Sequence, residues 1–501
     1  MWKPHEFSAR QGNSVNSAPA ADRTIFVLFL CLLVWVPLPL GSNRPWASAI
    51  LEVGLFSLAI AWIWLYCLGR VDLHTPLRRA WPALLLFACW LAWLAIQIVP
   101  LPADLLKIIA PVRANLPTPD PALAIRTLSI DPYATLGFLL KSCAYVAAFG
   151  LALALMHCRE RMRTVAIVII LAGLVQALLA SFMHLAMLNY QLFFTEMNHV
   201  ANAHGTFVNR NHLAGYLEIC LALGIGMMIA TLKGGTAQSW KQRFREIAAW
   251  LLSTRVLLRI SLVVMVIALV MTRSRMGNAA FFSSMLIAGV IGLATSKHAT
   301  QSTIILMASL IVIDIFIVGT WFGVDSLIQR YEQTTIYREM QPTGGSVEER
   351  LEPGLYAMAM LKDYPVTGSG GGSFYTAFPK YRPGAISAYF DHAHNDYIQI
   401  ATETGVIGLG LLGLIVLATF VVALRTLYER RDPLCRGIAF GATMGMISIM
   451  IHSWVDFNLQ IPANAFTFVV LLALAWVAYR LPSDRHIASS PAEDSIRRRD
   501  A

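Results

Sequence analysis

The sequence predicts an all-α polytopic membrane protein with about twelve transmembrane helices and one large loop outside the membrane. The first observation is composition: 57% of the 501 residues are hydrophobic and 14% are charged, whereas soluble domains carry roughly 25% charged residues. The second is that the apolar residues form repeated runs near the length of about 20 residues that a bilayer crossing needs. The third is that basic residues gather in the short connections between runs, as is typical of loops that set membrane topology.

Twelve apolar runs are the expected spans, of which the seventh and eleventh are short. The first run is not followed by a small-x-small cleavage site, and another run begins almost at once, so we interpret it as a retained helix and not a signal peptide. The runs are Thr24–Leu40, Trp46–Leu68, Trp81–Val99, Leu136–Met156, Thr164–Leu185, His212–Leu232, Leu257–Met271, Met276–Thr295, Thr303–Trp321, Val406–Leu424, Gly437–Ile451 and Ala463–Tyr479.

The basic residues predict on which side of the membrane each connection lies. With the N-terminus in the cytoplasm, 24 Lys and Arg residues fall on the cytoplasmic side and 13 fall on the outer side, where they are spread over longer connections. The positive-inside rule gives most weight to short loops. We therefore expect a membrane domain over residues 24–480 between two cytoplasmic tails, residues 1–23 and 481–501.

Composition argues against two other classes of protein. The net charge of +10 does not indicate a nucleic-acid-binding protein, because most of the basic residues are explained by topology. The seven cysteines are scattered, with no close pair and no C-x-x-C. The sequence therefore suggests neither a disulfide framework nor a zinc site.

The longest outer connection, residues 322–405, is the expected catalytic loop. It is rich in Gly, Pro and Tyr, and a loop of this length without a domain's worth of core is usually functional or disordered. Its aromatic residues favour an ordered loop. They are Tyr364, Phe374, Tyr375, Phe378, Tyr381, Tyr389 and Phe390.

Arginines at the outer ends of two spans are candidate phosphate ligands. Arg210 stands in the polar string 209–212 at the start of the sixth span, and Arg273 and Arg275 stand in a short turn between the seventh and eighth. Guanidinium groups match the geometry of phosphate with paired N–H donors and a permanent charge. The alternative is contact with ordinary lipid phosphates. Together these arginines can neutralise a diphosphate.

His394, in the string Asp391 to Asp396, has three interpretations that the residues leave open. It can be a general base, since a neutral imidazole titrates in the range needed to take a proton from a hydroxyl. It can be a metal ligand together with His392 and a neighbouring aspartate. It can also be a structural residue near the start of a helix over 397–404 that is capped by Asp391 or Asn395 and ends at Gly405.

A glycine run and a His/Asp pair are further polar features on the same side of the predicted membrane domain. The glycine run 368–374 lacks the Lys-Ser/Thr of a phosphate loop, so we interpret it as a tight bend. His452 and Asp456, at the outer end of the eleventh span, can reach the same cavity as His394 or can be satisfied interfacial residues.

Three motifs resemble the bacterial O-antigen ligase and polymerase family. His394-Asn395, nine residues and then Gly405-Val406-Ile407-Gly408 match its H-N-x9-G-x-x-G signature. The turn 272–275 is similar to the family's T-x-S-R, and 365–374 is similar to its P-x-x-G-x-G…F stretch. The similar segments extend from about Gly205 to Leu424.

The resemblance implies a membrane glycosyltransferase of the GT-C type in the bacterial inner membrane, with its active site on the periplasmic face. The donor implied is a glycan on undecaprenyl diphosphate. The acceptor implied is lipid A-core for a ligase, another carrier-linked glycan for a polymerase, or a protein hydroxyl for an O-oligosaccharyltransferase. His394 matches the essential histidine, and Arg210 and Arg275 match diphosphate-binding arginines, with neither metal nor cofactor. The supporting residues we expect are Arg273 at the diphosphate, and Asn211, His392, Asn395 and Glu403.

Two other classes remain as alternatives. A flippase or transporter of the same lipid carrier also needs outer arginines, but its spans are expected to be polar and broken by Gly or Pro near the midplane. A metal-dependent hydrolase needs a third ligand within a span, and no H-E-x-x-H motif occurs. We therefore favour glycan transfer.

Overall fold

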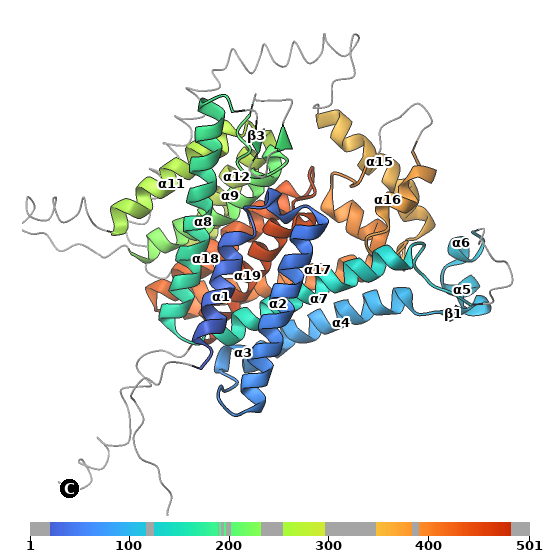
Figure 1. The fold of residues 1–501 in the computed structure, drawn as a ribbon, viewed down its shortest axis with the longest axis horizontal. Helices are drawn as coiled ribbons and strands as arrows, with labels where there is room; N and C mark the ends of the chain where they lie inside the picture. The colour runs from blue at the N-terminus through green and yellow to red at the C-terminus, as the bar shows by residue number, and fades with distance from the viewer. Residues whose placement is uncertain are drawn as a thin grey trace, which may run out of the picture.

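The computed structural model describes residues 21–116, 125–188, 190–191, 195–196, 202–231, 254–295, 347–382 and 390–481. Over these residues the chain is an all-α polytopic membrane protein (Figure 1). Nine of the helices described are long and apolar enough to cross a membrane, and α1 and α11 are shorter apolar helices.

The helices coincide with the expected spans but differ at some ends: α1 ends at Trp35 and not at Leu40, and α18, predicted as a short eleventh span, is long enough to cross a membrane. Each predicted run coincides with one of the helices except the ninth, Thr303–Trp321, which lies outside the described residues. The helices are α1 (Arg23–Trp35), α2 (Pro45–Cys67), α3 (Thr75–Arg79), α4 (Trp81–Ile98), α5 (Ala103–Ile109), α6 (Pro111–Ala114), α7 (Pro132–Leu155), α8 (Arg159–Leu185), α9 (Arg210–Ala230), α11 (Thr254–Met271), α12 (Arg275–Thr295), α15 (Val347–Asp363), α16 (Phe374–Ala377), α17 (Asp396–Glu429), α18 (Pro433–His452) and α19 (Pro462–Arg480), with 3-10 turns η1 (Leu40–Ser42), η3 (Phe378–Lys380) and η4 (Asn458–Gln460). Two antiparallel pairs of two-residue strands complete the list, β1 (Leu101–Pro102) with β2 (Ile125–Arg126), and β3 (Tyr190–Gln191) with β4 (Thr195–Glu196).

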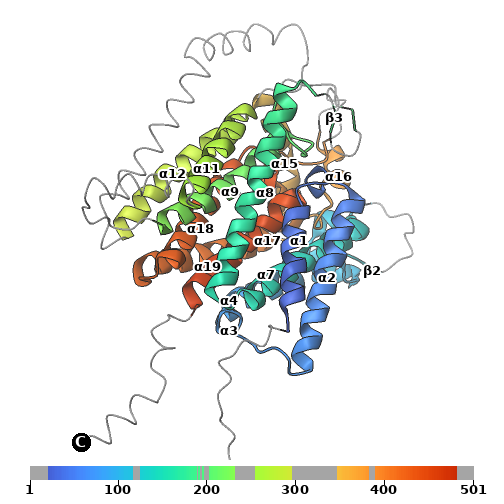
Figure 2. The same ribbon diagram turned by 60° about the vertical axis from the view of Figure 1, so that its left-hand side comes forward.

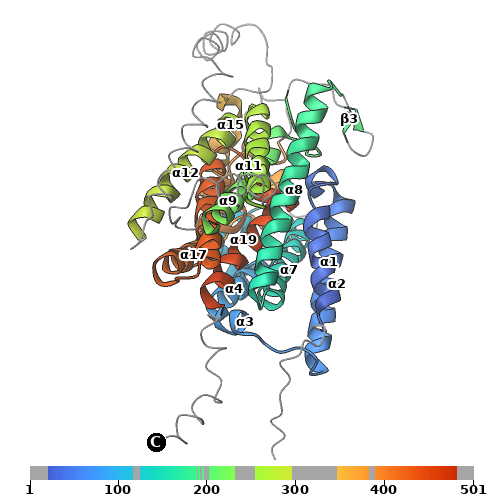
Figure 3. The same ribbon diagram turned by 90° about the vertical axis from the view of Figure 1, so that its left-hand side faces the viewer.

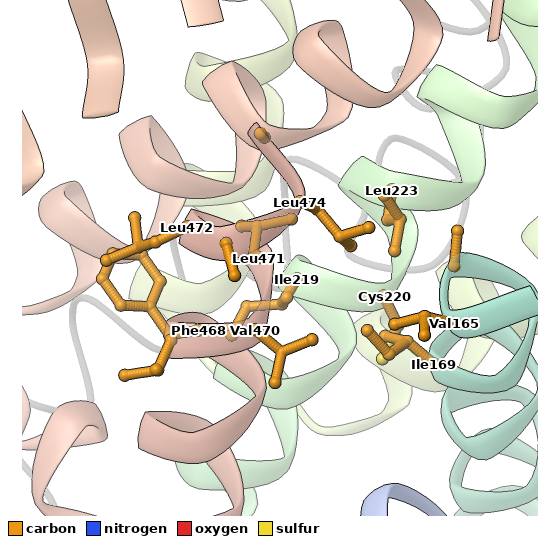
Figure 4. Close-up of a cluster of buried hydrophobic side chains, with 14 of the residues drawn as sticks. Val165, Ile169, Ile219, Cys220, Leu223, Phe468, Val470, Leu471, Leu472 and Leu474 are labelled. Atoms are coloured by element: carbon orange, nitrogen blue, oxygen red, sulfur yellow. The ribbon is translucent and has the colours of Figure 1, made fainter. Parts of the chain in front are cut away.

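Helix α9 forms the centre of the bundle. Its side chains lie between those of α8 and α19, as the close-up in Figure 4 shows for Ile219, Cys220 and Leu223. Against α18 the approach is closer, because a Cβ at Gly226 would meet the backbone of Gly437 and Gly441. Small residues that let helix backbones meet are typical of membrane helix interfaces. The helix that begins at Arg210 is therefore held rigidly by its neighbours.

Ion pairs join the helix ends at the end of the bundle where α1, α8 and α18 begin, here called the basic end. Arg161 Nη2 lies 2.8 Å from Asp22 Oδ1, which joins the starts of α8 and α1. Arg159 Nη1 lies 2.6 Å from Asp432 Oδ2, which joins α8 to the start of α18. In Figures 2 and 3 this end lies below, with α3, and α15 lies at the opposite end. Arg159 and Arg161, two of the basic residues predicted to face the cytoplasm, therefore lie at this end of the bundle.

Helix α17 is bent at a single glycine. Gly405 has φ 68° and ψ −175°, so the helix consists of a short first part and a longer apolar second part. The predicted short helix over 397–404 ending at Gly405, and the predicted span from Val406, are these two parts. The N–H of Val406 donates to the carbonyl of Pro365 at 2.9 Å, which ties the bend to the chain before the glycine run.

We expect Gly405→Ala to destabilise the protein strongly. A Cβ there would overlap the carbonyl of Val366 and lie 2.8 Å from the backbone nitrogen of Gly368, and the conformation alone costs a non-glycine residue about 1–3 kcal/mol. The measurement is the thermal unfolding midpoint in detergent. Gly410→Ala is the matched control, because a Cβ at this position of the same helix meets nothing within 4 Å. Equal midpoints for the two variants would contradict the prediction.

The chain between α12 and α17 contributes a small hydrophobic cluster of its own. Ala357, Met360 and Tyr364 near the end of α15 pack with Phe374 and Phe378. Val112 and Ile130, from the connection between α4 and α7, pack against the same cluster. The aromatic residues of this part of the loop are thus ordered, and they lie beside the start of α17 (Figure 1).

Candidate functional site

The glycine run 368–374, here called the glycine loop, is fixed by two buried side chains from transmembrane helices. Glu403 accepts from the backbone N–H of Gly372 at 2.9 Å and of Phe374 at 3.3 Å. Gln97, at the end of α4, accepts from the N–H of Gly371 at 3.0 Å. The loop is therefore more than the bend that the sequence suggested. Sequence reasoning missed Gln97, whose signal was a polar residue near the end of an apolar span.

A chain of polar contacts joins the glycine loop to His392. Gln399 Nε2 donates to Glu403 Oε1 at 3.3 Å. The same amide contacts His392 Nδ1, and its oxygen accepts from the N–H of Ala393 at 3.2 Å. Glu403 and His392 are thus connected through Gln399. These hydrogen bonds join the first part of α17 to residues 392–394, here called the histidine segment.

His394 lies immediately before the start of α17, in a left-handed conformation with φ 49°. The next residue, Asn395, is the N-cap: its side-chain oxygen accepts from the N–H of Ile398 at 3.0 Å. The Asn395 amide donates to the carbonyl of Trp454 at 2.8 Å. Asp396 accepts from Ser453 Oγ at 2.8 Å. The histidine segment is therefore anchored to the connection that follows α18.

Three imidazole rings surround the side chain of Phe457. The ring of Phe457 lies 4.2 Å from that of His392, 4.7 Å from that of His212 and 4.9 Å from that of His394, between ring centroids. His212 belongs to the first turn of α9. The structure thus brings the start of α9 next to the histidine segment, although more than 180 positions separate His212 from His394 in sequence.

Asp456 connects the start of α9 to the same place. Its carboxylate accepts from Asn211 Nδ2 at 2.6 Å and lies 3.5 Å from His212 Nε2. It also accepts from the N–H of Phe457 at 2.9 Å. Asn211, His212 and Asp456 are all buried. Asp456 is therefore a structural centre of the site, which sequence reasoning had left as one of two alternatives.

Two of the three arginines that the sequence predicts as phosphate ligands lie at neighbouring helix starts. Arg210 is the first residue of α9 and Arg275 the first of α12. A Cβ at Gly277, in the first turn of α12, would lie 2.6 Å from Cβ of Ala214 in α9, so these two helix starts are in contact. Helix N-termini carry a partial positive charge, which favours anions. Two helix starts, each beginning with an arginine, therefore lie in contact.

A hydroxyl-capped turn exposes Arg273 and Arg275. Thr272 Oγ1 accepts from the N–H of Ser274 at 3.1 Å, and Ser274 Oγ accepts from the N–H of Gly277 at 3.2 Å. Thr272 and Ser274 are buried, whereas the arginine side chains between and after them are exposed. The alternation explains the T-x-S-R pattern: the hydroxyls close the turn, and the arginines point outward.

A buried pair lies deeper in the bundle, below the start of α9. His452 Nδ1 lies 2.7 Å from Glu218 Oε1, and Ser448 Oγ donates to Glu218 Oε2 at 2.7 Å. Both members of the pair are fully buried. The pair fastens α9 to α18 just beneath the site. Sequence reasoning missed Glu218, although a carboxylate inside an apolar span is itself a signal.

His392 is held in its neutral form. The pKa of His392 is lowered from 6.5 to about 4, chiefly by burial; the contact with Gln399 opposes this shift, and the proximity of His212, His394 and Lys141 adds to it. The imidazole of His392 therefore carries no charge near neutral pH. It acts in the site as a hydrogen-bonding ring and not as a cation.

We expect His392 to make the protein sensitive to acid. The unfolded chain binds a proton at this residue with a pKa of 6.5, whereas the folded protein does so only near 4, so the free energy of unfolding falls as pH decreases through this window. His392→Gln removes that contribution. The measurement is the thermal midpoint of parent and variant at about pH 7 and about pH 5. The prediction is wrong if the thermal midpoint of His392→Gln falls between the two pH values by as much as that of the parent.

Among the residues that the structure describes, no group of three or more His, Cys, Asp or Glu side chains could hold a metal ion. The interpretation of His392 and His394 as metal ligands therefore lacks a third donor within these ranges. Of the predicted residues, the structure brings His394, His392, Asn395, Asn211 and Glu403 into one connected set through Phe457, Asp456 and Gln399, and places Arg210, Arg273 and Arg275 at the adjoining helix starts.

Comparison with known families gives one match. The family model described as O-antigen ligase matches residues 260–413, a segment that includes Arg273, Arg275, His394 and Glu403. Arg210 and Asn211 lie outside this segment. A search of curated proteins finds no relative of the chain.

Proposed function

We propose that the chain, whose residues 260–413 match the family model described as O-antigen ligase, transfers a glycan from undecaprenyl diphosphate to an acceptor hydroxyl. The match supports glycosyl transfer of the O-antigen ligase or polymerase type in surface polysaccharide biosynthesis. The donor, the acceptor, independence of metal ions and the roles of single residues are parts of the proposal.

One observation carries the proposal: a candidate base and candidate diphosphate ligands meet at one end of the bundle. His394 contacts Phe457, which contacts His212 in α9. The helix that holds His212 begins with Arg210 and is packed against the start of α12, which begins with Arg275. An acceptor hydroxyl and a diphosphate leaving group need these two kinds of partner at one place.

The proposed reaction is a single displacement. The acceptor hydroxyl gives its proton to the imidazole of His394 while its oxygen forms a bond to the anomeric carbon of the donor. The bond between that carbon and the phosphate oxygen breaks, and undecaprenyl diphosphate leaves with the electron pair. Arg210, Arg275 and Arg273 stabilise the negative charge of the leaving group. The imidazolium then releases its proton to water, and the configuration at the anomeric carbon is inverted.

We place the site on the periplasmic face of the inner membrane, with both termini in the cytoplasm. The clustering of arginines at the basic end supports this orientation. Tyr375 is half exposed in the outer segment beside the site, so a single cysteine there, in a variant without the native cysteines, reports its side. Labelling of intact spheroplasts by an impermeant maleimide is the expected result. Labelling only after permeabilisation would contradict the orientation.

The experiment that tests the function uses the purified full chain in liposomes. The donor is glycan on undecaprenyl diphosphate, and lipid A-core, a second carrier-linked glycan and a Ser/Thr-rich protein are offered separately as acceptors. We expect one acceptor to be glycosylated with release of undecaprenyl diphosphate, and activity to survive EDTA. If no acceptor is glycosylated while the carrier crosses the bilayer, the chain is a transporter. Loss of activity in EDTA that a divalent cation restores would refute metal independence.

A further inference from the structure

The side chain of Phe457 contacts all three histidines of the site. His212 comes from α9, His392 and His394 come from the segment before α17, and Phe457 comes from the connection between α18 and α19. The ring of His392 is stacked on it, at an interplanar angle of 26°, whereas the rings of His212 and His394 meet it edge to face, at 69° and 71°. Both arrangements are favourable for aromatic pairs.

The position of Phe457 is itself fixed from two sides. Its backbone N–H donates to Asp456 Oδ1 at 2.9 Å, and its ring packs against His212, whose Nε2 lies 3.5 Å from the same carboxylate oxygen. Asn211 Nδ2 holds the other oxygen of Asp456 at 2.6 Å. Asn211, His212 and Asp456 are each at most 3% exposed. Backbone and ring of Phe457 therefore depend on one buried carboxylate.

The position of His394 in the chain is the reason why contacts with neighbouring rings matter for its imidazole. It precedes the N-cap of α17, in a left-handed conformation, and so lies outside the regular helix. A side chain at such a place has several rotamers open to it unless neighbouring atoms restrict them. The ring of Phe390 is 6.4 Å from that of His394, farther than the 4.9 Å to Phe457. Phe457 is therefore the nearer of the two aromatic walls.

We propose that Phe457 is a positioning residue that sets the orientation of the His394 imidazole, and that His212, held by Asp456, supports Phe457 from behind. The inference rests on the proposed function in one respect only, that His394 is the base. It adds a physical link between α9, which begins with Arg210, and the imidazole of His394. The start of α9 carries both Arg210 and His212, so a displacement of this helix moves the diphosphate ligand and the support of the base together.

The first test is the substitution Phe457→Leu in the full chain, assayed for transfer in liposomes. Because a misplacement of about 1 Å at a reacting group can cost roughly 100-fold in rate, we expect kcat to fall by roughly 10- to 100-fold. The KM for the carrier-linked donor should change little, since the arginines are untouched. Phe457→Tyr keeps the ring and should restore most of kcat. Parental kcat in Phe457→Leu would overturn the proposal.

A second readout does not depend on transfer. Diethyl pyrocarbonate modifies accessible neutral imidazoles, and mass spectrometry of the peptide gives the rate for His394 separately from that of His392. We expect the modification of His394 to become several-fold faster in Phe457→Leu, because one wall of its site is gone. An unchanged rate would overturn the positioning role. If His394→Ala transfers glycan normally, the proposed function fails instead, and the modification rates still decide whether Phe457 orients the ring.

Two further variants separate positioning from loss of folding. His212→Leu removes the support of Phe457 but keeps both Phe457 and His394. We expect kcat to fall in this variant too, by less than in Phe457→Leu, and His394 to be modified faster than in the parent. Phe29→Leu is the matched control, since Phe29 is a buried phenylalanine with an edge-to-face partner, Phe466, at 5.8 Å, and it belongs to α1, outside the cluster around Phe457. We expect it to keep parental kcat. A His212→Leu variant that is folded, fully active and unchanged in modification would contradict the support by His212.

Discussion

Replacement of His394 by alanine is expected to reduce kcat by roughly 10²- to 10⁴-fold, the range that a positioned general base contributes. The physical reason is that the acceptor hydroxyl keeps its proton until a base takes it, and the neighbouring imidazoles are differently placed. His392 contacts Gln399 and is stacked on Phe457, and His212 is buried against Asp456. Neither His392 nor His212 can take the place of the His394 imidazole without a change in the backbone. The measurement is glycan transfer in liposomes at saturating donor and acceptor.

The control for this prediction is a histidine near the end of a transmembrane helix. His184→Ala, in the last turn of α8, removes an imidazole outside the cluster around Phe457, and we expect parental kcat. His394→Gln adds a further comparison, because an amide can hydrogen-bond but cannot accept the proton. An active His394→Gln variant would show that hydrogen bonding alone is needed, and the assignment of His394 as a base would be wrong.

Loss of a diphosphate arginine is the second large effect. We expect Arg275→Ala to lower kcat/KM by roughly 10²- to 10³-fold, which corresponds to about 2.7–4 kcal/mol, by analogy with the removal of a donor from an oxyanion hole. Arg210→Ala should have a similar effect, because both arginines begin helices that are in contact. Arg275→Lys should recover only part of the loss, since lysine keeps the charge but not the paired donors.

The matched control is Arg44→Ala. Arg44 is an exposed arginine at the N-cap of α2. It lies at the same end of the bundle as Arg275 but outside the site. We expect its kcat/KM to be that of the parent. If Arg44→Ala and Arg275→Ala lose activity equally, the effect is one of surface charge on the membrane, and the two helix starts are not a diphosphate site.

The family match narrows which of these residues belong to the recognisable domain. Residues 260–413 contain Arg273, Arg275 and His394, but Arg210 lies 50 positions before this segment. The contact of Gly277 with Ala214 is what joins the two parts. If Arg210→Ala proves as harmful as Arg275→Ala, the functional unit is larger than the matched segment.

Local sequence determined the spans, because each span depends on residues that are neighbours in the chain. An apolar run of sufficient length must form a helix in a bilayer, since its backbone groups have no other partner there. The helices coincide with the runs for this reason, and the ninth run, Thr303–Trp321, stays a prediction. The bend at Gly405 was also visible, because the glycine stood between a capped polar helix and an apolar run.

The motifs likewise named His394 and the arginines, but not what surrounds them. Only packing decided that Glu403 holds the glycine loop, that Gln97 reaches across 306 positions to Glu403, and that Phe457 contacts three histidines. None of these side chains differs from the residue types that are common at such positions in a membrane protein's sequence. Their importance arises from the way α4, α9, α17 and the chain after α18 meet, and such contacts between distant segments leave no periodic pattern in a single sequence.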